Sequence, residues 1–313
     1  MANSFQRYPV CGLAVDPIHV GTGGARLGRV DLSIVRDPVT RIPKIPGSSL
    51  AGVCRAYAAM EYSKYPDCAG QGQASSNGGT GGHCGSADCR ICTVFGFARG
   101  GQGGFAGLAA FSDAHVLLFP VATREGPVWL TCPTALRLAG METDLSDNVL
   151  YRGQPSQPLN LGWLLLPVEQ SNEWNKAQQA IQNIAAPAYV AERMGILSDK
   201  LFSHVVNSNL ETRTSVSIDP ATGAADAEKG ALFTYEALPR STILMWDVTC
   251  RNPAHFKVGG SKATTVKTFD EVFTVVSATH TYFEHLGIGG MGTRGMGRLR
   301  VLPTPSSATP ATS

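Results

Sequence analysis

The sequence predicts an α+β fold of ferredoxin-like type that carries large insertions. Its apolar patterns run in the order strand, helix, strands, then further strands, a helix and a final strand. The 313 residues are 43% hydrophobic and only 16% charged, which is typical of a chain that buries a large core. The 35 glycines and 19 prolines indicate many turns and long connecting loops.

The first half of this core is expected up to residue 131. A helix should begin at Pro46-Gly-Ser-Ser49, because apolar residues recur behind it at helical spacing (Leu50, Val53, Cys54 and Tyr57). Residues 66–92 form an insertion rich in Gly, Ser and Cys, without periodicity. The strands predicted for this half are 10–15, 108–121 and 128–131.

The second half follows a region, 137–188, in which we expect helical stretches and a Pro-Gln loop at 153–160. Residues 211–237 are predicted to form a long hairpin with a polar tip, because the alternating strand 212–218 leads into a turn at 219–223 and a returning strand at 231–235. The remaining predictions are a helix capped by Ser198, a helix at 269–283, strands at 243–249 and 298–302, and a disordered tail at 304–313.

The cellular compartment is predicted from the absence of long apolar segments in the sequence. No apolar run is long enough to span a bilayer, and the N-terminal residues lack the apolar core of a signal peptide. We therefore expect a cytoplasmic protein without a membrane partner. In a reducing cytoplasm, clustered cysteines bind metal more often than they form disulfides.

Five potential metal ligands lie in the insertion: Cys68, His83, Cys84, Cys89 and Cys92. The spacing Cys84-x4-Cys89-x2-Cys92 predicts a zinc-knuckle loop, with Cys68 as the fourth ligand and His83 as the alternative. A loop this polar cannot fold by burying apolar surface, so structural zinc would supply its ordering energy. The other four cysteines lie in apolar contexts and are expected in the core (Cys11, Cys54, Cys132 and Cys250).

Basic residues concentrate at the two ends of the chain. Residues 1–60 contain seven Arg or Lys against three Asp, a net charge of +4, and Arg294, Arg298 and Arg300 follow Glu284 with no acid after it. If the two ends meet in the fold, they form one basic face suited to nucleic acid. The alternative is a set of basic side chains scattered over a solvated surface.

The glycine loop from Leu286 to Arg298 is the strongest local feature, with six glycines around one arginine. Such a backbone can approach a ligand closely and present successive amide N–H groups to phosphates. A helix precedes the loop and a strand follows it, the reverse of a dinucleotide-binding site, so we expect a polynucleotide backbone as the ligand. A purely structural turn is the alternative. The expected contacts with that backbone are Gly289, Gly290, Arg294, Gly295 and Gly297.

A second phosphate site is predicted where the first helix begins. Free amide N–H groups, two hydroxyls and a lysine meet there, and the helix dipole favours an anion. Arg55, further along the helix, is expected to face the same phosphates. Plain N-capping by Ser48 or Ser49 is the alternative. The expected RNA contacts are Lys44, Gly47, Ser48, Ser49 and Arg55.

Asp31 is a candidate catalytic acid among Arg26, Arg29 and Arg36. Beside an RNA phosphate it could anchor a divalent ion or help to deprotonate a 2′-hydroxyl, whereas a salt bridge to an arginine is the alternative. His19, in the preceding loop, is either an acid or base of the same site or a hydrogen-bonded structural histidine.

Several short motifs follow one another in a characteristic order. They are Pro17-Ile-His-Val-Gly21, Val30-Asp-Leu-Ser-Ile-Val-Arg-Asp-Pro38, Ile45-Pro-Gly-Ser-Ser-Leu50, Phe111-Ser-Asp-Ala114, Leu118-Phe-Pro120, Thr131-Cys-Pro133, Leu197-Ser-Asp199, Gly230-Ala-Leu-Phe-Thr-Tyr-Glu236 and the terminal glycine loop. Together they resemble the RAMP superfamily of CRISPR-associated proteins over nearly the whole chain, most closely the backbone subunit of type III-B (Cmr) effector complexes. The cysteine-rich insertion resembles instead the equivalent subunit of type III-A (Csm) complexes.

The resemblance implies an RNA-recognition-like core in a single RAMP domain, residues 1–303. Several copies of the chain would stack along one guide CRISPR RNA, together with other type III effector subunits. The hairpin at 211–237 would be the family's thumb, which wedges into the duplex of guide and complementary target RNA. Family members cut the target beside each wedge in a reaction that needs a divalent metal, Mg or Mn, and an aspartate whose position Asp31 matches. The cut would leave a cyclic phosphate and a 5′-hydroxyl.

Two other functions stay open. A non-catalytic subunit would hold guide RNA, with Asp31 only bridging to arginine, and an unrelated metabolic enzyme would use the glycine loop for a phosphorylated cofactor. Retained nucleic acid with a steep salt dependence would exclude the metabolic enzyme. Cleavage of target RNA would exclude the non-catalytic subunit.

Overall fold

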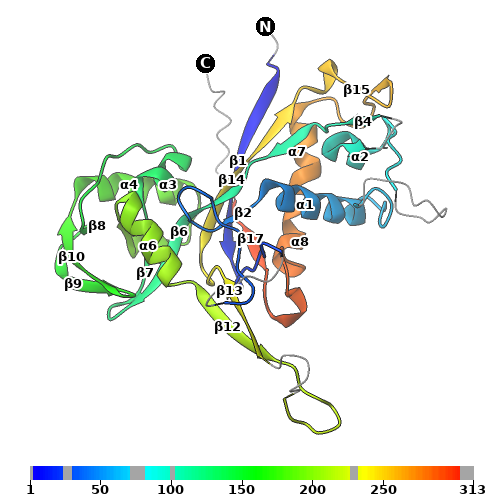
Figure 1. The fold of residues 1–313 in the computed structure, drawn as a ribbon. Coiled ribbons are helices and arrows are strands. Elements are labelled where there is room, and N and C mark those ends of the chain that lie inside the picture. The colour runs from blue at the N-terminus through cyan, green and yellow to red at the C-terminus, as the bar shows by residue number, and fades with distance from the viewer. Residues whose placement is uncertain (1–2, 24–29, 71–81, 99–102, 226–231, 304–313) are drawn as a thin grey trace.

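The computed structural model describes residues 3–23, 30–70, 82–98, 103–225 and 232–303. Figure 1 shows helices packed around one large sheet, the α+β architecture that the sequence predicts. The strands of this sheet are β1 (Phe5–Ala14), β2 (Lys44–Ile45), β5 (Ala109–Phe111), β6 (Ala114–Thr123), β7 (Gly126–Thr131), β8 (Leu150–Arg152), β9 (Ser156–Leu161), β10 (Leu164–Gln170), β11 (Met194–Ile196), β14 (Ile243–Arg251) and β17 (Leu299–Val301). Their order is β17-β1-β14-β6-β7-β11-β8-β10-β9, with β2 paired to β6 and β5 to β14.

The two ends of the chain meet in this sheet. β1 pairs antiparallel with β14 from Phe5↔Arg251 to Leu13↔Ile243, and with β17 along its other edge. β14 in turn pairs antiparallel with β6. Three helices lie on one side of these four strands in Figure 1, and α7 packs against both β1 and β14. They are α1 (Gly47–Glu61), α7 (Phe269–Ser277) and α8 (His280–His285).

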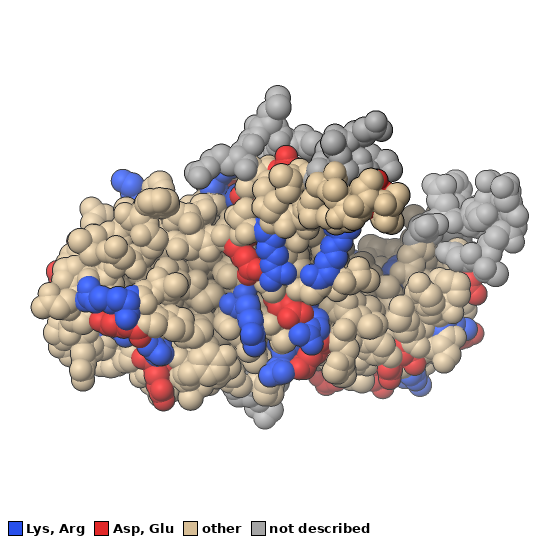
Figure 2. Space-filling view, turned by 90° about the horizontal axis from the view of Figure 1, so that it is seen from below, with Lys and Arg blue, Asp and Glu red and all other residues tan. Residues whose placement is uncertain are grey.

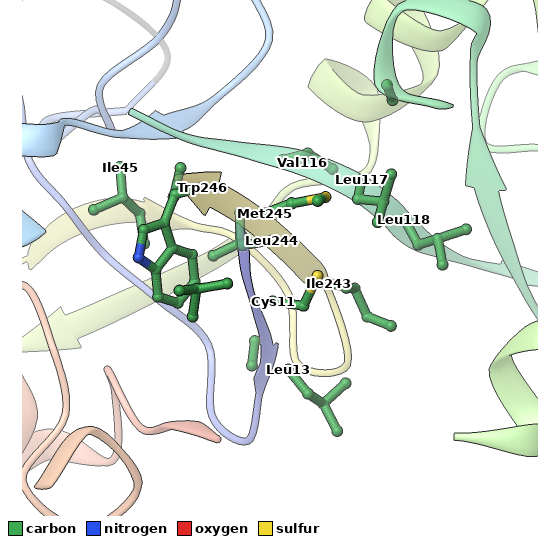
Figure 3. Close-up of a cluster of buried hydrophobic side chains, with 14 of the residues drawn as sticks. Cys11, Leu13, Ile45, Val116, Leu117, Leu118, Ile243, Leu244, Met245 and Trp246 are labelled. Carbon is green, nitrogen blue, oxygen red and sulfur yellow. The ribbon is translucent and has the colours of Figure 1, made fainter. Parts of the chain in front are cut away.

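The centre of the sheet is buried on both faces. Leu117 and its neighbour Leu118 on β6 are both 0% exposed, although consecutive strand residues point to opposite faces. Figure 3 shows them near side chains of β14 and of Cys11 on β1. Strands covered on both faces read as continuous apolar runs, which is why the sequence predicts β6 and β14 without alternation. The four cysteines expected in the core are buried (Cys11, Cys54, Cys132 and Cys250).

The middle of the chain forms a second part of the sheet, with strands β7 to β11 and helices α3 (Pro133–Leu138), α4 (Asn172–Asn183), α5 (Ala188–Glu192) and α6 (Asp199–Ser208). The predicted loop at 153–160 is wrong, because β9 occupies most of it and pairs antiparallel with β10. Strand β9 lies at the edge of the sheet, where Pro158 is tolerated because one side of the strand needs no donor.

Two predicted elements are interrupted. The strand expected at 108–121 divides into β5 and β6, because the step from Phe111↔Val248 to His115↔Met245 holds one more residue than the facing step on β14. An extra residue of this kind bends a strand and leaves a position unpaired. The helix expected at 269–283 divides at Ala278 and Thr279 into α7 and α8.

The predicted hairpin strands are confirmed as β12 (Glu211–Val216) and β13 (Leu232–Ala237), which pair from Glu211↔Ala237 to Val216↔Leu232. A hydrogen bond of 2.8 Å from Gly223 N to Asp219 O closes the predicted turn. Figure 1 shows the hairpin projecting away from the sheet at the bottom of the view. Residues 226–231 near its tip, like the tail at 304–313, lie outside the described residues.

A short helix, α2 (Arg90–Phe95), packs against α1 at the end of the cysteine-rich insertion. Two small ribbons, β3 (Phe97–Ala98) with β4 (Gly104–Phe105) and β15 (Lys257–Val258) with β16 (Ser261–Lys262), lie nearer α2 than α1 in Figure 1. Part of that insertion, residues 71–81, lies outside the described residues. No helix among the described parts of the chain is both long and apolar enough to cross a bilayer.

Candidate nucleic-acid interface

Segments from three parts of the chain meet at the base of the hairpin. Leu32 N donates to Thr234 O at 3.1 Å, and Glu236 N donates to Leu32 O at 3.1 Å, so the segment after the first loop runs along β13. Met296 of the terminal glycine loop packs with Tyr235 of β13 in a small buried cluster. The loop that contains Asp31, the hairpin and the glycine loop therefore form one surface.

Asp31 is exposed and is held by one residue of the hairpin. Its Oδ2 accepts hydrogen bonds from Thr234 N at 2.7 Å and from Thr234 Oγ1 at 3.0 Å. The backbone bond from Thr234, reinforced by its hydroxyl, holds the pKa of Asp31 below the usual value. Arg36 pairs with Glu236 at 2.8 Å rather than with Asp31, while Arg26 and Arg29 lie outside the described residues.

His19 lies inside the same region but not at its surface. It is 5% exposed, and its Nδ1 lies 2.6 Å from Glu236 O. The carbonyl of His19 accepts from Gly290 N at 2.8 Å, so the residue connects the hairpin to the glycine loop. This burial argues against the expected acid or base role, and it supports the structural alternative for His19.

The glycine loop packs closely on the His19 loop. Gly289 has φ of +87°, and a Cβ there would lie 2.4 Å from His19 O, so only glycine fits this position. Gly289, Gly290, Arg294 and Gly295 are exposed as expected of RNA contacts, whereas Gly297 is buried. The amides of Gly290 and Gly297 donate to protein carbonyls, which removes those two N–H groups from the expected phosphate cradle.

Arg294 is the exposed cation of this loop. Its guanidinium carbon lies 5.8 Å from the centre of the Phe233 ring of β13, close to the range for a cation–π contact. An arginine over an aromatic ring on the surface presents a cation and a flat face together, which suits a nucleic-acid backbone and its bases.

The predicted basic face is largely neutralised by ion pairs, although the ends of the chain do meet. Arg298 pairs with Asp16, and Arg300 pairs with Glu284. Figure 2, viewed from the hairpin side, shows Lys and Arg side chains next to Asp and Glu side chains across the middle of this face. Among the described residues, this arrangement favours the alternative of basic side chains scattered over a solvated surface.

The predicted phosphate site at the start of α1 is already filled by a carboxylate. Asp113 accepts hydrogen bonds from Lys44 Nζ at 2.6 Å and from Gly47 N at 2.8 Å. The bond to Asp113 raises the pKa of Lys44 above its usual value. Neither serine caps the helix, since Pro46 is the N-cap residue, and the side chain that bonds to the first turn is that of Asp113. Ser48 is exposed and Ser49 is partly exposed, so the hydroxyls remain accessible.

Arg55 is not brought to this site. It is 9% exposed, and its guanidinium donates to Cys68 O and to Gly96 O, both at 2.6 Å. Its third contact is His83 Nδ1 at 2.7 Å. The expectation that Arg55 faces RNA phosphates is thus contradicted, because its guanidinium points into the cysteine-rich insertion.

The four predicted cysteines come together beside Arg55. The Sγ atoms of Cys68, Cys84, Cys89 and Cys92 all lie within 4.8 Å of one another. Three of the separations are 3.6 Å, 3.7 Å and 3.9 Å. A tetrahedral zinc with Zn–S bonds of about 2.3 Å has S···S edges of about 3.8 Å, so the cluster fits such an ion. Cys68 rather than His83 completes the set.

Sequence reasoning missed the side chains that hold the site together. Thr234 was inside the predicted hairpin, but nothing in a single polar residue indicates which distant carboxylate it will bind. Asp113 lies in the quoted motif Phe111-Ser-Asp-Ala114, and its position directly before a buried strand was the available signal. Glu236, which binds both Arg36 and Ile34 N, had no signal beyond the pattern of β13.

Comparison with known proteins decides the family. Residues 13–300 match the RAMP superfamily. The chain belongs to the RAMP superfamily. The match includes the Asp31 loop, the hairpin and the terminal glycine loop.

Two curated relatives match short stretches of this RAMP protein. The CRISPR system Cms endoribonuclease Csm3 of Methanothermobacter thermautotrophicus is 39% identical over 83 residues, which are 26% of this chain and 29% of the relative. Csm3 of Mycobacterium tuberculosis is 44% identical over 45 residues, 14% of this chain and 19% of the relative. The aligned stretches therefore span less than a third of each relative.

Solved structures match almost from end to end. A subunit of the type III-B Cmr-beta complex bound to cognate target RNA has a TM-score of 0.64 at 17% identity, covering 96% of this chain and 98% of that chain. A crystal structure of Cmr4 has a TM-score of 0.57 at 20% identity, covering 96% and 100%. At these identities the similarity establishes a shared fold. The sequence relatives thus carry the Csm name, and the structures carry the Cmr name.

Proposed function

We propose that this RAMP protein is a backbone subunit of a type III CRISPR effector complex, which holds guide RNA and cuts complementary target RNA. The observation that carries the proposal is the position of Asp31, exposed at the base of a projecting hairpin and bonded to Thr234 of that hairpin. If the hairpin inserts into the duplex of guide and target RNA, Asp31 at its base lies beside the target strand that the hairpin distorts. The names of the Csm3 and Cmr-beta relatives support the same class of substrate.

The strand order supports the proposed RNA-binding core. Strands β17-β1-β14-β6 are antiparallel neighbours, and α1 and α7–α8 connect β1 to β6 and β14 to β17 in sequence. This is the split βαβ order of a ferredoxin-like core, the arrangement expected for an RNA-recognition-like domain within residues 1–303. The accessible candidates for guide contacts are Ser48, Ser49, Gly289, Gly290, Arg294 and Gly295.

The hairpin β12–β13 is proposed to act as the thumb. Val216, Ile218 and Leu232 are 44%, 52% and 69% exposed on it. Exposed apolar side chains on a projecting ribbon can insert between base pairs and partly unstack them. Further copies of the chain and other type III subunits would then stack along the guide, which agrees with a shared fold over the whole length of a Cmr-beta subunit.

Asp31 is proposed to position the cutting reaction. The 2′-oxygen of the target attacks the adjacent phosphorus, the bond to the 5′-oxygen breaks, and a proton leaves the 2′-hydroxyl while the 5′-oxygen gains one. The lowered pKa of Asp31 keeps it anionic near neutral pH and makes it a weak base, which favours anchoring a divalent ion over taking the proton. Mg or Mn bound there would neutralise charge on the phosphate.

The cysteine cluster is proposed to hold one structural zinc. Cys68, Cys84, Cys89 and Cys92 would supply four thiolates, which leave no open position for substrate. Cys68 and Cys84 lie between α1 and α2 in sequence, Cys89 is the N-cap residue of α2 and Cys92 lies within α2. Metal binding would therefore order the insertion rather than take part in cutting.

The test is cleavage of a labelled complementary RNA by the reconstituted guide-bound complex with magnesium. We expect regularly spaced cuts, and Asp31→Asn should reduce the cleavage rate by about 100-fold or more while target binding persists. Asp144→Asn, an exposed aspartate in the segment between α3 and β8, is the matched control and should cut normally. Unchanged cutting by Asp31→Asn would remove Asp31 from the mechanism. No cutting by either protein would favour the non-catalytic scaffold.

A further inference from the structure

Arg55 is a buried cation without a carboxylate partner among the described residues. Its guanidinium donates to three carbonyls, those of Cys68, Phe95 and Gly96, and contacts a ring nitrogen of His83. Neutral acceptors satisfy the donors of a guanidinium, but they do not cancel its charge. A charge in a poorly solvated position costs several kcal/mol unless an opposite charge lies close by.

The cysteine cluster is the group that can carry that opposite charge. Cys92 Sγ lies 4.0 Å from Arg55 Nη2, and Cys68 presents both its carbonyl to Arg55 and its Sγ to the cluster. Four thiolates around one divalent ion have a net charge of −2, so a loaded cluster would be an anion buried beside a cation.

We propose that Arg55 is the charge-compensating partner of a tetrathiolate complex of a divalent metal in this cluster. The inference rests on the structural-metal part of the proposed function and adds a residue that is not itself a ligand. Two of its hydrogen bonds reach Cys68 and Gly96, which flank most of the insertion. Arg55 therefore fixes the ends of the metal-binding segment to α1 and offsets the charge at its centre.

The charge of Arg55 and the packing of its side chain should have different effects on the metal-loaded and metal-free states. A charge-compensating residue stabilises the loaded state and does little for, or even destabilises, the metal-free state, where the anion is weaker. A residue that acts only by packing stabilises both states equally. Arg55→Met keeps the length and most of the apolar stem but removes the charge, and Arg55→Lys keeps the charge but loses the forked donor geometry.

The experiment compares wild type, Arg55→Met, Arg55→Lys and the control Arg90→Met, an exposed arginine next to ligand Cys89. Zinc per chain is measured after dialysis, and affinity is measured by competition with a coloured chelator. Thermal unfolding is recorded for zinc-loaded and metal-free protein. Cobalt spectra report whether the ion still has four thiolate ligands.

We expect Arg55→Met to weaken zinc binding by about 10- to 100-fold, the usual range for partners outside the ligand set, with a tetrathiolate cobalt spectrum. Its midpoint of unfolding should fall only when zinc is bound. Arg55→Lys should retain part of the affinity, and Arg90→Met should match wild type.

Other results would overturn the inference. If Arg55→Met binds zinc within twofold of wild type, the charge is not needed. If it lowers the midpoint equally with and without zinc, Arg55 acts only by packing. If wild type itself binds no metal, the proposed metal site fails first, and the inference falls with it for a distinguishable reason.

Discussion

The start of α1 and the terminal glycine loop are predicted to bind the same kind of ligand, but the fold uses their cations differently. Both combine glycine with a cation, and both are predicted to bind phosphate. At the helix start, Asp113 accepts from Lys44 and from Gly47 N, so the anion position is occupied from within. At the glycine loop, amide groups are used internally while Arg294 stays exposed above Phe233. An anion site is therefore defined by where the internal counter-charge lies, and not by its glycines.

The largest effect is expected from the tightest glycine of the loop. Gly289→Ala places a Cβ 2.4 Å from His19 O at a φ of +87°, so it should lower the free energy of unfolding by about 1–3 kcal/mol and weaken RNA binding. Gly292→Ala is the control, since the nearest atom to its Cβ is 3.9 Å away. Urea unfolding measures the stability of the two variants, and RNA titration measures their affinity. Equal stability of the two variants would mean that the loop does not depend on its contact with His19.

The next effect concerns how the hairpin holds Asp31. Thr234→Val removes the hydroxyl that helps to depress the pKa of Asp31, so that pKa should rise towards the ordinary value of about 3.9. A lowered pKa keeps Asp31 ionised until the pH falls through it, and the variant should therefore lose cleavage at a higher pH than wild type. Cleavage rates across acidic pH measure this shift. Thr214→Val, opposite Thr234 on β12, should leave the profile unchanged.

Arg294 should contribute one phosphate contact. Arg294→Met is expected to lower the slope of log affinity against log salt by about 0.7 for single-stranded RNA, with a few-fold loss of affinity. Arg137→Met, an exposed arginine at the end of α3, is the matched control. A slope that stays the same in Arg294→Met would exclude this arginine from the interface.

The smallest effect is expected at the helix start, and it has the opposite sign. Asp113→Asn removes the nearer of the two carboxylates around Lys44, the other being that of Asp37 at 3.9 Å. It should raise the same salt slope by up to about 0.7 if RNA passes this site. Loss of the partly exposed ion pair should cost about 1 kcal/mol of stability or less. Salt-dependent RNA titrations of Asp113→Asn and Arg294→Met in one series measure the two opposite changes in slope. An unchanged slope would make the helix start a structural element only.

The sequence predicts the elements of this fold better than their contacts. Hydrophobic patterns identify β1, β6, β14 and the hairpin, because burial on one or both faces produces an alternating or continuous apolar sequence. The cysteine spacing predicts the metal cluster, because ligands close in sequence must be close in space. Edge strand β9 was missed, since a short strand with proline lacks that record.

The direction of a charged side chain was the least predictable property. Arg55 and Lys44 belong to the same predicted site, but one faces the cysteine cluster and the other faces Asp113. His19 lies in the motif Pro17-Ile-His-Val-Gly21, in a loop where exposure is expected. It is nevertheless buried between the hairpin and the glycine loop. Each outcome depends on a partner more than ten residues away, which periodicity and spacing do not encode.

The bond between Asp31 and Thr234 also sets a length scale. Because the hairpin itself holds the acid, the offset between the point where the hairpin meets RNA and the point where Asp31 meets RNA is built into one chain. Each copy in a stack would have the same distance between the hairpin and Asp31, whatever the sequence of the RNA. The periodicity of the cuts would then measure the repeat of the protein rather than any property of its target.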